Sequence, residues 1–344
     1  MTVPSGPGPV HRILVIKLRA VGDVLLSTIV TKNLRLAYPS AQIHYLTERP
    51  SLDVLKGNPF VDDVLVYDRK TMSGAGLIRA VRRRHYDVVI DLFGNPRTAL
   101  LTRLSGARRR VGFRFRGRTY AYNIVVEPRG NRVHNTEFNL DALGALGVAI
   151  QDRSVYFSFD DDDARFVDSF LPPVFARGSF VVCINSGGGW YTKRWGLERF
   201  AVLADKLVEE YDARIVLPWG PGELQEAEEL RKAMTRDAFI PPATTLRQLG
   251  ALLKRCSIVV SNDSGPLHIA AAVGTPVLGI YGPTDPLLQG PYGDHHLVVR
   301  NEGLDCLGCN LTSCPIGHPC MLGLSGETVL QGVRLLLAKN RITP

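Results

Sequence analysis

The chain has 344 residues, 45% hydrophobic and 22% charged, which is ordinary for a globular protein of two domains of about 150 residues each. Lysine and arginine outnumber aspartate and glutamate by 41 to 33, and the net charge of +8 favours an anionic partner. The apolar runs are too short for a membrane span or a signal peptide, which predicts a cytoplasmic protein, and residues 1–10 are Pro/Gly-rich and predict a flexible tail.

The first half of the chain alternates short β-branched runs with helical stretches. Strands are expected at Arg12–Leu18, Gln42–Thr47, Val61–Tyr67 and Tyr86–Leu92, and a first helix at Val24–Leu36. Strand, helix and strand at this spacing predict βαβ units and a parallel sheet. We therefore expect an N-terminal Rossmann-like domain over residues 11–160.

An acidic run, Asp160–Asp163, interrupts this alternation and predicts a linker over residues 161–175, with its carboxylates solvating a surface turn. The alternation then restarts. Strands are expected at Ser179–Asn185, Ala213–Leu217, Ser257–Ser261, Pro276–Tyr281 and His296–Arg300, and helices at Leu197–Tyr211, Glu223–Ala233, Thr245–Lys254 and Glu327–Lys339. This pattern predicts a second Rossmann-like domain over 176–326 and a C-terminal helix within 327–344.

The segment from Ile258 to Pro276 has the clearest functional pattern. A strand is followed by a tight polar turn, Asn262–Gly265, and then by a helix. Backbone N–H groups at such a helix start form a ready phosphate site, to which Asp263, Ser264, Gly265 and His268 would contribute. The alternative is that Asp263 or Ser264 only caps the helix and that His268 is a packed side chain.

Two further loops follow strands of the same half. In the first, Ser186, Gly188 and Gly189 allow the backbone to wrap an anion and Lys193 supplies a positive charge; the alternative is a flexible turn before a packed Trp195. In the second, Glu223 opens a helix, where its carboxylate either holds the hydroxyls of a ribose or is only a favourable N-terminal charge. Since ligands bind at the carboxyl ends of parallel strands, the three loops predict one diphosphate-and-ribose pocket.

In the first half, the turn Lys17–Val24 follows the first strand and contains Arg19 and Asp23. Asp23 stands at the start of the first helix, where the helix dipole keeps a carboxylate ionised. It is a candidate general base for an acceptor hydroxyl, or else an ordinary N-terminal capping charge.

Positive charge is concentrated in two short runs, Arg82–Arg84 and Arg108–Arg118. Nucleic acid, a phosphorylated lipid and a phosphorylated sugar are compatible partners, and a solvated basic face is the alternative. From the second run we take Arg108, Arg114, Arg116 and Arg118, together with Arg19, as candidates for binding an anionic acceptor.

Four cysteines lie close together near the C-terminus with the spacing Cys306-x2-Cys309-x4-Cys314-x5-Cys320. Four thiols at this spacing are a candidate structural zinc site, and reduced packing cysteines or disulfides are the alternatives.

Taken together, these segments resemble the heptosyltransferase family, glycosyltransferase family 9, whose members work on the lipopolysaccharide core. The resemblance covers almost the whole chain in order, through ILVIKLRAVGDVLLSTIV, WYTKRWGLERF, PWGPGE and SNDSGPLHIAAAVGTPVLGIYGPTDP. It implies a GT-B fold with two Rossmann-like domains facing a central cleft, and an inverting glycosyltransferase that uses ADP-heptose and requires no catalytic metal or other cofactor. The implied acceptor is a Kdo- or heptose-bearing lipid at the inner face of the inner membrane.

The resemblance also implies roles for individual residues. Asp23 matches the family's base, Lys193 the basic residue on the donor diphosphate, and Glu223 the residue that contacts the adenosine ribose. The loop that grips the donor's sugar and phosphates matches Asp263, Ser264, Gly265 and His268. Gly188 and Gly189 stand where some members have hydroxyls, so backbone contacts are expected there.

Two rival functions remain at this stage. One is a nucleotide-sugar transferase with another sugar or acceptor, in capsule or O-antigen assembly. The other is a non-catalytic protein that binds nucleic acid or phospholipid through its arginines. Nucleic acid is not expected, because the chain carries no RNA- or DNA-binding motif and this reading leaves Asp23, Lys193 and Glu223 without a shared purpose.

Overall fold

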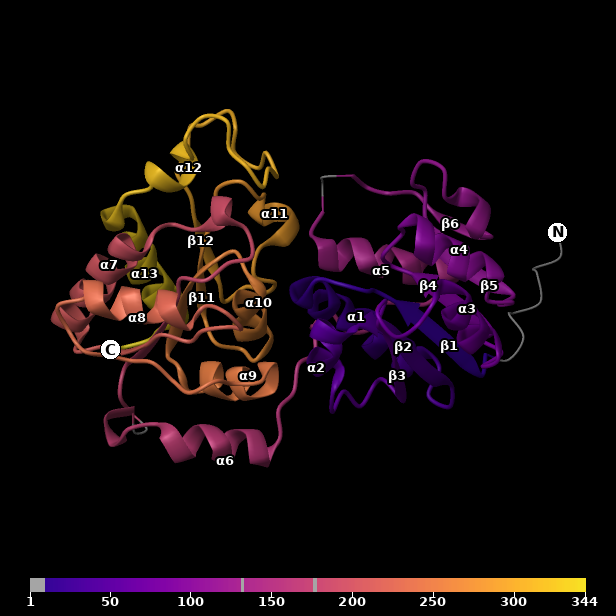
Figure 1. Ribbon diagram of the computed structural model, residues 1–344, viewed down its shortest axis with the longest axis horizontal. Helices are drawn as coiled ribbons and strands as arrows, with labels where there is room; N and C mark the ends of the chain where they lie inside the picture. The colour runs from indigo at the N-terminus through magenta and orange to yellow at the C-terminus, as the bar shows by residue number, and fades with distance from the viewer. Residues whose placement is uncertain (1–9, 131–132, 176–177) are drawn as a thin grey trace. The chain divides into compact units, whose positions relative to one another are not determined.

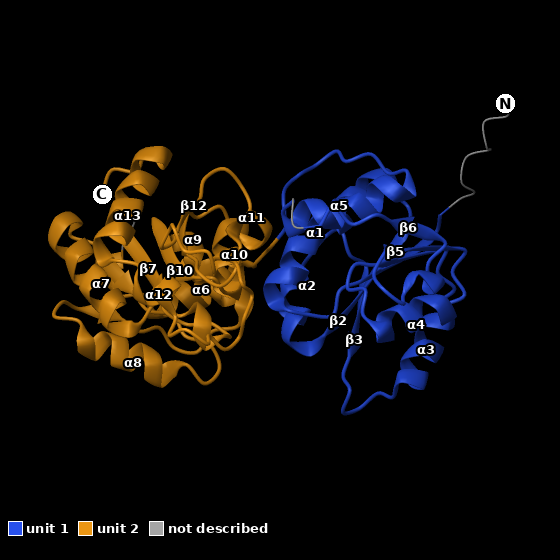
Figure 2. Cartoon of the chain, turned by 90° about the horizontal axis from the view of Figure 1, so that it is seen from above, with its two compact units in different colours: residues 1–156 blue, residues 157–344 orange. Residues whose placement is uncertain are grey.

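The computed structural model describes residues 10–130, 133–175 and 178–344 (Figure 1). The chain forms two compact units, residues 1–156 and 157–344 (Figure 2), and the division lies close to the predicted boundary at residue 160. The predicted tail over 1–10 lies, apart from Val10, outside the described residues. Among the helices of the described part of the chain, none combines the length and the apolarity that crossing a bilayer requires.

Unit 1 contains a six-stranded parallel sheet with the strand order β3-β2-β1-β4-β5-β6. Its strands are β1 Arg12–Ile16, β2 Gln42–Glu48, β3 Asp63–Tyr67, β4 Val88–Asp91, β5 Arg109–Phe113 and β6 Ile124–Val126. Its helices are α1 Val21–Ala37, α2 Leu52–Leu55, α3 Gly74–Arg82, α4 Pro96–Leu104 and α5 Asn135–Leu146. The four predicted strands are confirmed, whereas β5 and β6 were not expected because arginines open the first and the second is only three residues long.

The helices of unit 1 cover both faces of this sheet. Helix α1 packs against α5, and α3 packs against α4. One core cluster joins Leu77 and Val81 of α3 and Leu101 of α4 to Leu14 and Ile16 of β1. Burial on both faces explains why β1 reads as an uninterrupted apolar run.

Unit 2 repeats the architecture with the strand order β12-β11-β10-β7-β8-β9, again all parallel. Its strands are β7 Val181–Asn185, β8 Arg214–Val216, β9 Ala238–Phe239, β10 Ile258–Asn262, β11 Val277–Ile280 and β12 Leu297–Val299. Its helices are α6 Asp161–Phe170, α7 Leu197–Tyr211, α8 Leu224–Ala233, α9 Leu246–Arg255, α10 Gly265–Ala272, α11 Pro286–Gln289, α12 Pro319–Leu322 and α13 Gly326–Asn340. The five strands and four helices predicted here are confirmed in type, and β9 escaped prediction because it has only two residues.

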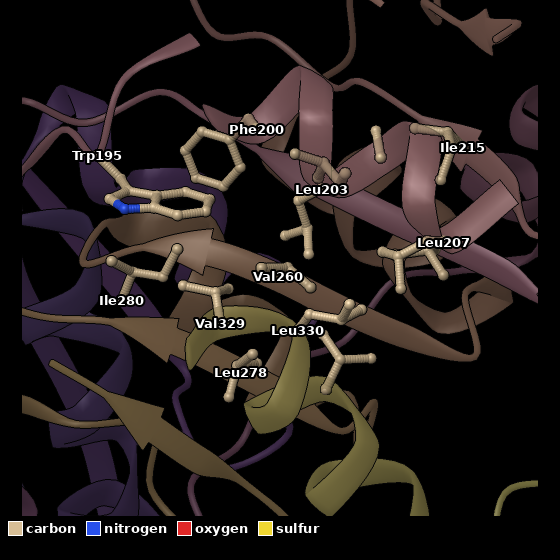
Figure 3. Packing of buried hydrophobic residues seen from close by; sticks show 14 of the residues in the cluster. Trp195, Phe200, Leu203, Leu207, Ile215, Val260, Leu278, Ile280, Val329 and Leu330 are labelled. Atoms are coloured by element: carbon tan, nitrogen blue, oxygen red, sulfur yellow. The ribbon is translucent and has the colours of Figure 1, made fainter. Parts of the chain in front are cut away.

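One core cluster of unit 2 lies between its sheet and helices α7 and α13 (Figure 3). Trp195 is fully buried and meets Phe200 edge to face at 5.1 Å. Its indole N–H donates to the Leu324 carbonyl at 2.9 Å, which satisfies its single polar atom. Trp195 is therefore packed in the core, as the alternative for this loop expected, and it anchors the end of the glycine-rich loop.

The predicted linker is wrong in its local structure. Residues 161–170 form α6, and Asp160 caps this helix by accepting from the Asp163 N–H at 3.0 Å. Arg247 of α9 pairs with both carboxylates, at 2.5 Å to Asp160 and 2.8 Å to Asp163. The acidic run therefore starts a helix and ties it to α9, because carboxylates stabilise the unpaired N–H groups of a helix start.

Candidate functional site

Strands β10, β7 and β8 are neighbours in the unit 2 sheet, so the loops that follow them meet at one edge. These loops begin after Asn262, Asn185 and Val216. The loops, together with the first turn of α10, carry every residue predicted to bind a donor. The structure therefore brings the three predicted loops together at the carboxyl edge of this sheet.

Asp263 and Lys193 form the charged centre of this edge. The Lys193 Nζ lies 2.6 Å from the Asp263 Oδ2 and 4.5 Å from the centre of the Trp190 ring. The Thr284 hydroxyl donates to the same Asp263 oxygen at 2.7 Å. Asp263 is 4% exposed, so this ion pair is shielded from solvent and held in one geometry. Asp263 is thus the partner of a lysine and not the cap of α10.

Ser264 takes the N-cap position of α10, yet its hydroxyl caps nothing. Instead it accepts from the Asn185 Nδ2 at 2.9 Å, and the same amide donates to the Ser261 hydroxyl at 2.8 Å. The alternative of a simple helix cap therefore fails for both candidates. Gly265 is the first residue of α10 and His268 lies buried in its first turn. The N–H groups that begin this helix are oriented to attract an anion.

Asn262 is a site residue that sequence reasoning did not single out. Its Nδ2 donates to the Ser186 carbonyl at 2.6 Å, and its Oδ1 accepts from the Trp195 N–H at 3.2 Å. One buried side chain thus holds both ends of the glycine-rich loop. The only sequence signal for this role was its place at the end of a buried strand.

Within the glycine-rich loop, the Gly188 carbonyl accepts from two nitrogens of Arg194, at 3.1 Å and 3.0 Å. A third Arg194 nitrogen lies 2.7 Å from the Glu226 Oε2. Burial raises the pKa of Glu226, and the Arg194 charge opposes that rise. Gly189 has open space where a side chain would stand. The backbone near Gly188 is therefore braced and the backbone near Gly189 is accessible.

Glu223 precedes α8 and folds back toward the glycine-rich loop. Its Oε2 accepts from the Gly220 N–H at 3.0 Å, so its side chain orders its own turn. A Cβ added to Gly187 would stand 2.9 Å from both carboxylate oxygens of Glu223. A side chain at position 187 would displace the Glu223 carboxylate, so a glycine there lets the two loops approach closely, a feature that sequence reasoning missed.

A cavity of about 480 Å³ borders this site and contacts Ser186, Arg194, Gly222 and Glu226. Of the predicted donor residues in the described chain, Ser186 is the one that lines it. Lys193, Asp263 and Ser264 lie in the adjoining loops instead, so the cavity adjoins the predicted pocket and does not coincide with it.

In unit 1, the first helix begins three residues earlier than predicted, at Val21. Asp23 is therefore the third residue of α1 and not its cap. One of its carboxylate oxygens accepts from the Ala20 N–H at 3.1 Å, and the side chain is only half-buried. Arg19 lies exposed in the preceding turn. Both residues follow β1, at the carboxyl edge of the unit 1 sheet.

The predicted arginine stretch is divided between the two edges of this sheet. Arg108 precedes β5, and its Nη2 lies 3.9 Å from Asp87, whose carboxylate also accepts from the His11 and Arg12 N–H groups. This is the amino edge, opposite Asp23, so Arg108 lies apart from the other four arginines predicted to bind the acceptor and from Asp23. The next two arginines of the stretch, Arg109 and Arg110, are part of β5 itself.

The other three predicted arginines follow β5 at the same edge as Asp23. Arg114 pairs with Glu127 at 2.5 Å, Arg118 lies over the Phe115 ring at 5.9 Å, and Arg116 is exposed. The structure therefore gathers Arg19, Asp23, Arg114, Arg116 and Arg118 at one edge.

The four clustered cysteines are free thiols that line one cavity of about 70 Å³ together with His318. Burial raises the pKa of Cys320. In the described ranges, no three His, Cys, Asp or Glu side chains are placed so as to hold a metal ion.

Comparisons with known proteins place the chain in a family. The family described as glycosyltransferase family 9 (heptosyltransferase) matches residues 75–318. The lipopolysaccharide core heptosyltransferase OpsX of Haemophilus influenzae is 26% identical over 83% of each chain. Lipopolysaccharide heptosyltransferase 3 of Escherichia coli K12 is 28% identical over 81% of this chain and 84% of its own length.

Among solved structures, ADP-heptose lps heptosyltransferase II of E. coli superposes with a TM-score of 0.77. The match covers 96% of this chain and all of that one at 22% identity, a likeness that concerns the fold alone. It confirms the predicted α/β class and the GT-B fold. The chain has two Rossmann-like units, and the family match covers most of its length. It therefore belongs to glycosyltransferase family 9, the heptosyltransferase family.

Proposed function

We propose that this glycosyltransferase transfers heptose from ADP-heptose to a Kdo- or heptose-bearing lipid of the lipopolysaccharide inner core, with inversion at the anomeric carbon. The observation that carries the proposal is the buried Lys193–Asp263–Thr284 cluster beside the start of α10. Such a site suits a diphosphate linked to a sugar, because it offers a cation, backbone N–H groups and a hydrogen-bonding carboxylate together. The similar proteins are named as heptosyltransferases of lipopolysaccharide, which supports heptose as the sugar.

In the proposed reaction, the Asp23 carboxylate takes the proton of an acceptor hydroxyl. The acceptor oxygen attacks the anomeric carbon from the face opposite the leaving group, and the bond from that carbon to the phosphate oxygen breaks. ADP leaves with the bonding electrons, and its added charge is stabilised by Lys193 and the N–H groups at the start of α10. These groups supply the stabilisation for which other transferases use a divalent ion, so we propose that no metal is required.

Further roles complete the donor site. Glu223 is assigned to the adenosine ribose because its carboxylate lies at the turn after β8. Ser186, Gly188, Gly189, Ser264, Gly265 and His268 are assigned to the sugar and phosphates as predicted. In unit 1 we propose that Arg19, Arg114, Arg116 and Arg118 bind the anionic acceptor at the inner face of the membrane.

The structural zinc remains a separate proposal. The four thiols line one cavity, which supports a zinc site. Their positions in this structure, however, do not match those of a set of metal ligands. Metal analysis of purified protein tests it: one equivalent of bound zinc is expected, and metal-free folded protein contradicts it.

Donor selection tests the function directly. Calorimetric titration is expected to give ADP binding at least tenfold tighter than UDP binding. Turnover of ADP-heptose with an inner-core acceptor should release ADP, and NMR should show inverted configuration at the anomeric carbon of the product. The reaction should continue after divalent ions are chelated. Tight UDP binding with weak ADP binding would favour the capsule or O-antigen transferase instead.

A further inference from the structure

Helices α3 and α4 form an exposed side of unit 1 that carries apolar residues. Leu100 and Leu104 of α4 are 45% and 37% exposed, and they stand four residues apart, on one side of the helix. Helix α4 contacts both α3 and the short helix Thr119–Ala121. Helices α3 and α4 adjoin in both views (Figures 1 and 2). Tyr120 of that short helix is 56% exposed. Two leucines and a tyrosine are therefore exposed to solvent on neighbouring helices of unit 1.

The same side is strongly basic. Arg79, Arg82 and Arg83 lie on α3 or at its end, and Arg103 lies on α4 beside the leucines; all four are exposed. Within the described residues, no carboxylate forms an ion pair with any of them. Between Lys70 and Val126 the sequence holds two carboxylates, Asp87 and Asp91, and Asp91 is fully buried. The positive charge of this side is therefore not locally neutralised.

We propose that this α3–α4 face docks on the surface of an anionic lipid bilayer. The face is defined by Arg79, Arg82, Arg83, Leu100, Arg103 and Leu104. Basic residues attract anionic headgroups, and leucines between them enter the boundary between headgroups and acyl chains. Neither signal alone gives stable attachment, and this face combines both.

The leucines distinguish a bilayer from nucleic acid as the partner. A phosphodiester backbone would use the arginines and leave Leu100 and Leu104 in water. A bilayer uses both kinds of side chain. The inference rests on the proposed function to the extent that a lipid-linked acceptor explains why the enzyme needs the membrane.

The test uses the full chain and sedimentation with vesicles of phosphatidylcholine, with or without phosphatidylglycerol. The wild type is expected to bind the anionic vesicles only. R79Q/R82Q/R83Q is expected to bind about a hundredfold more weakly, at about fivefold for each arginine. L100S/L104S is expected to lose about tenfold. The matched control is L335S, which removes a 55% exposed leucine from α13 of unit 2 and should bind as the wild type does.

Several outcomes would overturn the proposal: no binding of the wild type to anionic vesicles, wild-type binding by both face variants, or an equal loss in L335S. Binding to single-stranded RNA that depends on the arginines but not on the leucines, with no vesicle binding, would assign the face to nucleic acid. ADP affinity, measured on the same samples, should not change in any variant. If the protein binds anionic vesicles but does not prefer ADP to UDP, the proposed function is contradicted while the docking face is supported.

Discussion

The carboxyl edges of the two sheets share one topology and differ in how their side chains are held. In unit 2, buried side chains tie together the segments at the ends of β7, β10 and β11 by hydrogen bonds. These side chains belong to Asp263, Asn262 and Asn185. In unit 1, the half-buried Asp23 contacts the Ala20 N–H, and its neighbours Arg19 and Arg116 are exposed. We infer that the first edge is prearranged to stabilise the charge of a leaving diphosphate, and that the second remains open to a large anionic acceptor. Variants at each edge test this difference.

The largest effect is expected at Asp23. Asp23→Ala should lower the transfer rate about a thousandfold, because the acceptor hydroxyl loses its general base. ADP affinity should stay unchanged, since the donor residues lie in unit 2. Initial rates and ADP titration measure the two quantities.

The matched control is Asp53→Ala, which removes another first-turn carboxylate of unit 1, one paired with Lys56 at 2.5 Å. It should transfer at the wild-type rate. Near-normal turnover in Asp23→Ala would remove Asp23 from the mechanism.

On the donor side, Lys193→Gln should lower kcat/KM about a hundredfold and weaken ADP binding. The loss has two physical causes: the diphosphate loses its cation, and the buried Asp263 carboxylate loses its partner. Thr284→Val should have a smaller effect of the same kind, about fivefold, because Lys193 still pairs with Asp263. The half-buried Lys206 of α7, which pairs with Glu327, offers the control Lys206→Gln. Unchanged ADP affinity in Lys193→Gln would contradict the assignment.

A pH titration probes the stability of unit 2. Burial, His295 and Lys339 lower the pKa of His296 to about 4, and the Val277 N–H donates to its Nδ1 at 3.2 Å. The folded state holds this imidazole neutral, while the unfolded chain protonates it below about pH 6.5. The neutral His296 therefore contributes fully to the free energy of unfolding above pH 6.5. This contribution is lost as the pH falls toward 4, by roughly 3 kcal/mol in total.

Urea unfolding of the wild type and of His296→Gln across this range measures the difference. The wild type should lose more stability on acidification than the variant does. His11→Gln, at an exposed position of unit 1, should follow the wild type. Parallel curves for the wild type and His296→Gln would show that His296 does not titrate in this range.

The smallest effect concerns the contact between the glycine-rich loop and the turn after β8. Gly187→Ala should destabilise the chain by about 0.5–1 kcal/mol, because the new methyl displaces the Glu223 carboxylate from the Gly220 N–H. In a Glu223→Ala background the same change should cost far less. Unfolding of the two single variants and the double variant gives the coupling energy. Equal losses in both backgrounds would show that the two loops do not restrain each other.

The sequence alone determined much of the fold. Apolar runs such as ILVI in β1 and VVCI in β7 predict the central strands, since a strand buried on both faces has no polar alternation. Short edge strands were invisible to this signal: β9 has two residues and β5 opens on arginines, so pairing with a neighbour defines them. The acidic run at 160–163 predicts a turn from the sequence alone, because the residue that pairs with it, Arg247, is distant in sequence.

The same division holds for the candidate site. Local chemistry determined which loops carry the polar residues: glycines, Lys193 and Asp263 follow buried strands, and ligands bind where parallel strands end. Only the tertiary structure decided how these residues pair. It joined Lys193 to Asp263 and Thr284, set Glu223 against Gly187, and separated Arg108 from Asp23 at opposite edges of one sheet. The reason is physical: strand order and direction decide which loops are neighbours, and both are fixed by packing between elements far apart in the chain.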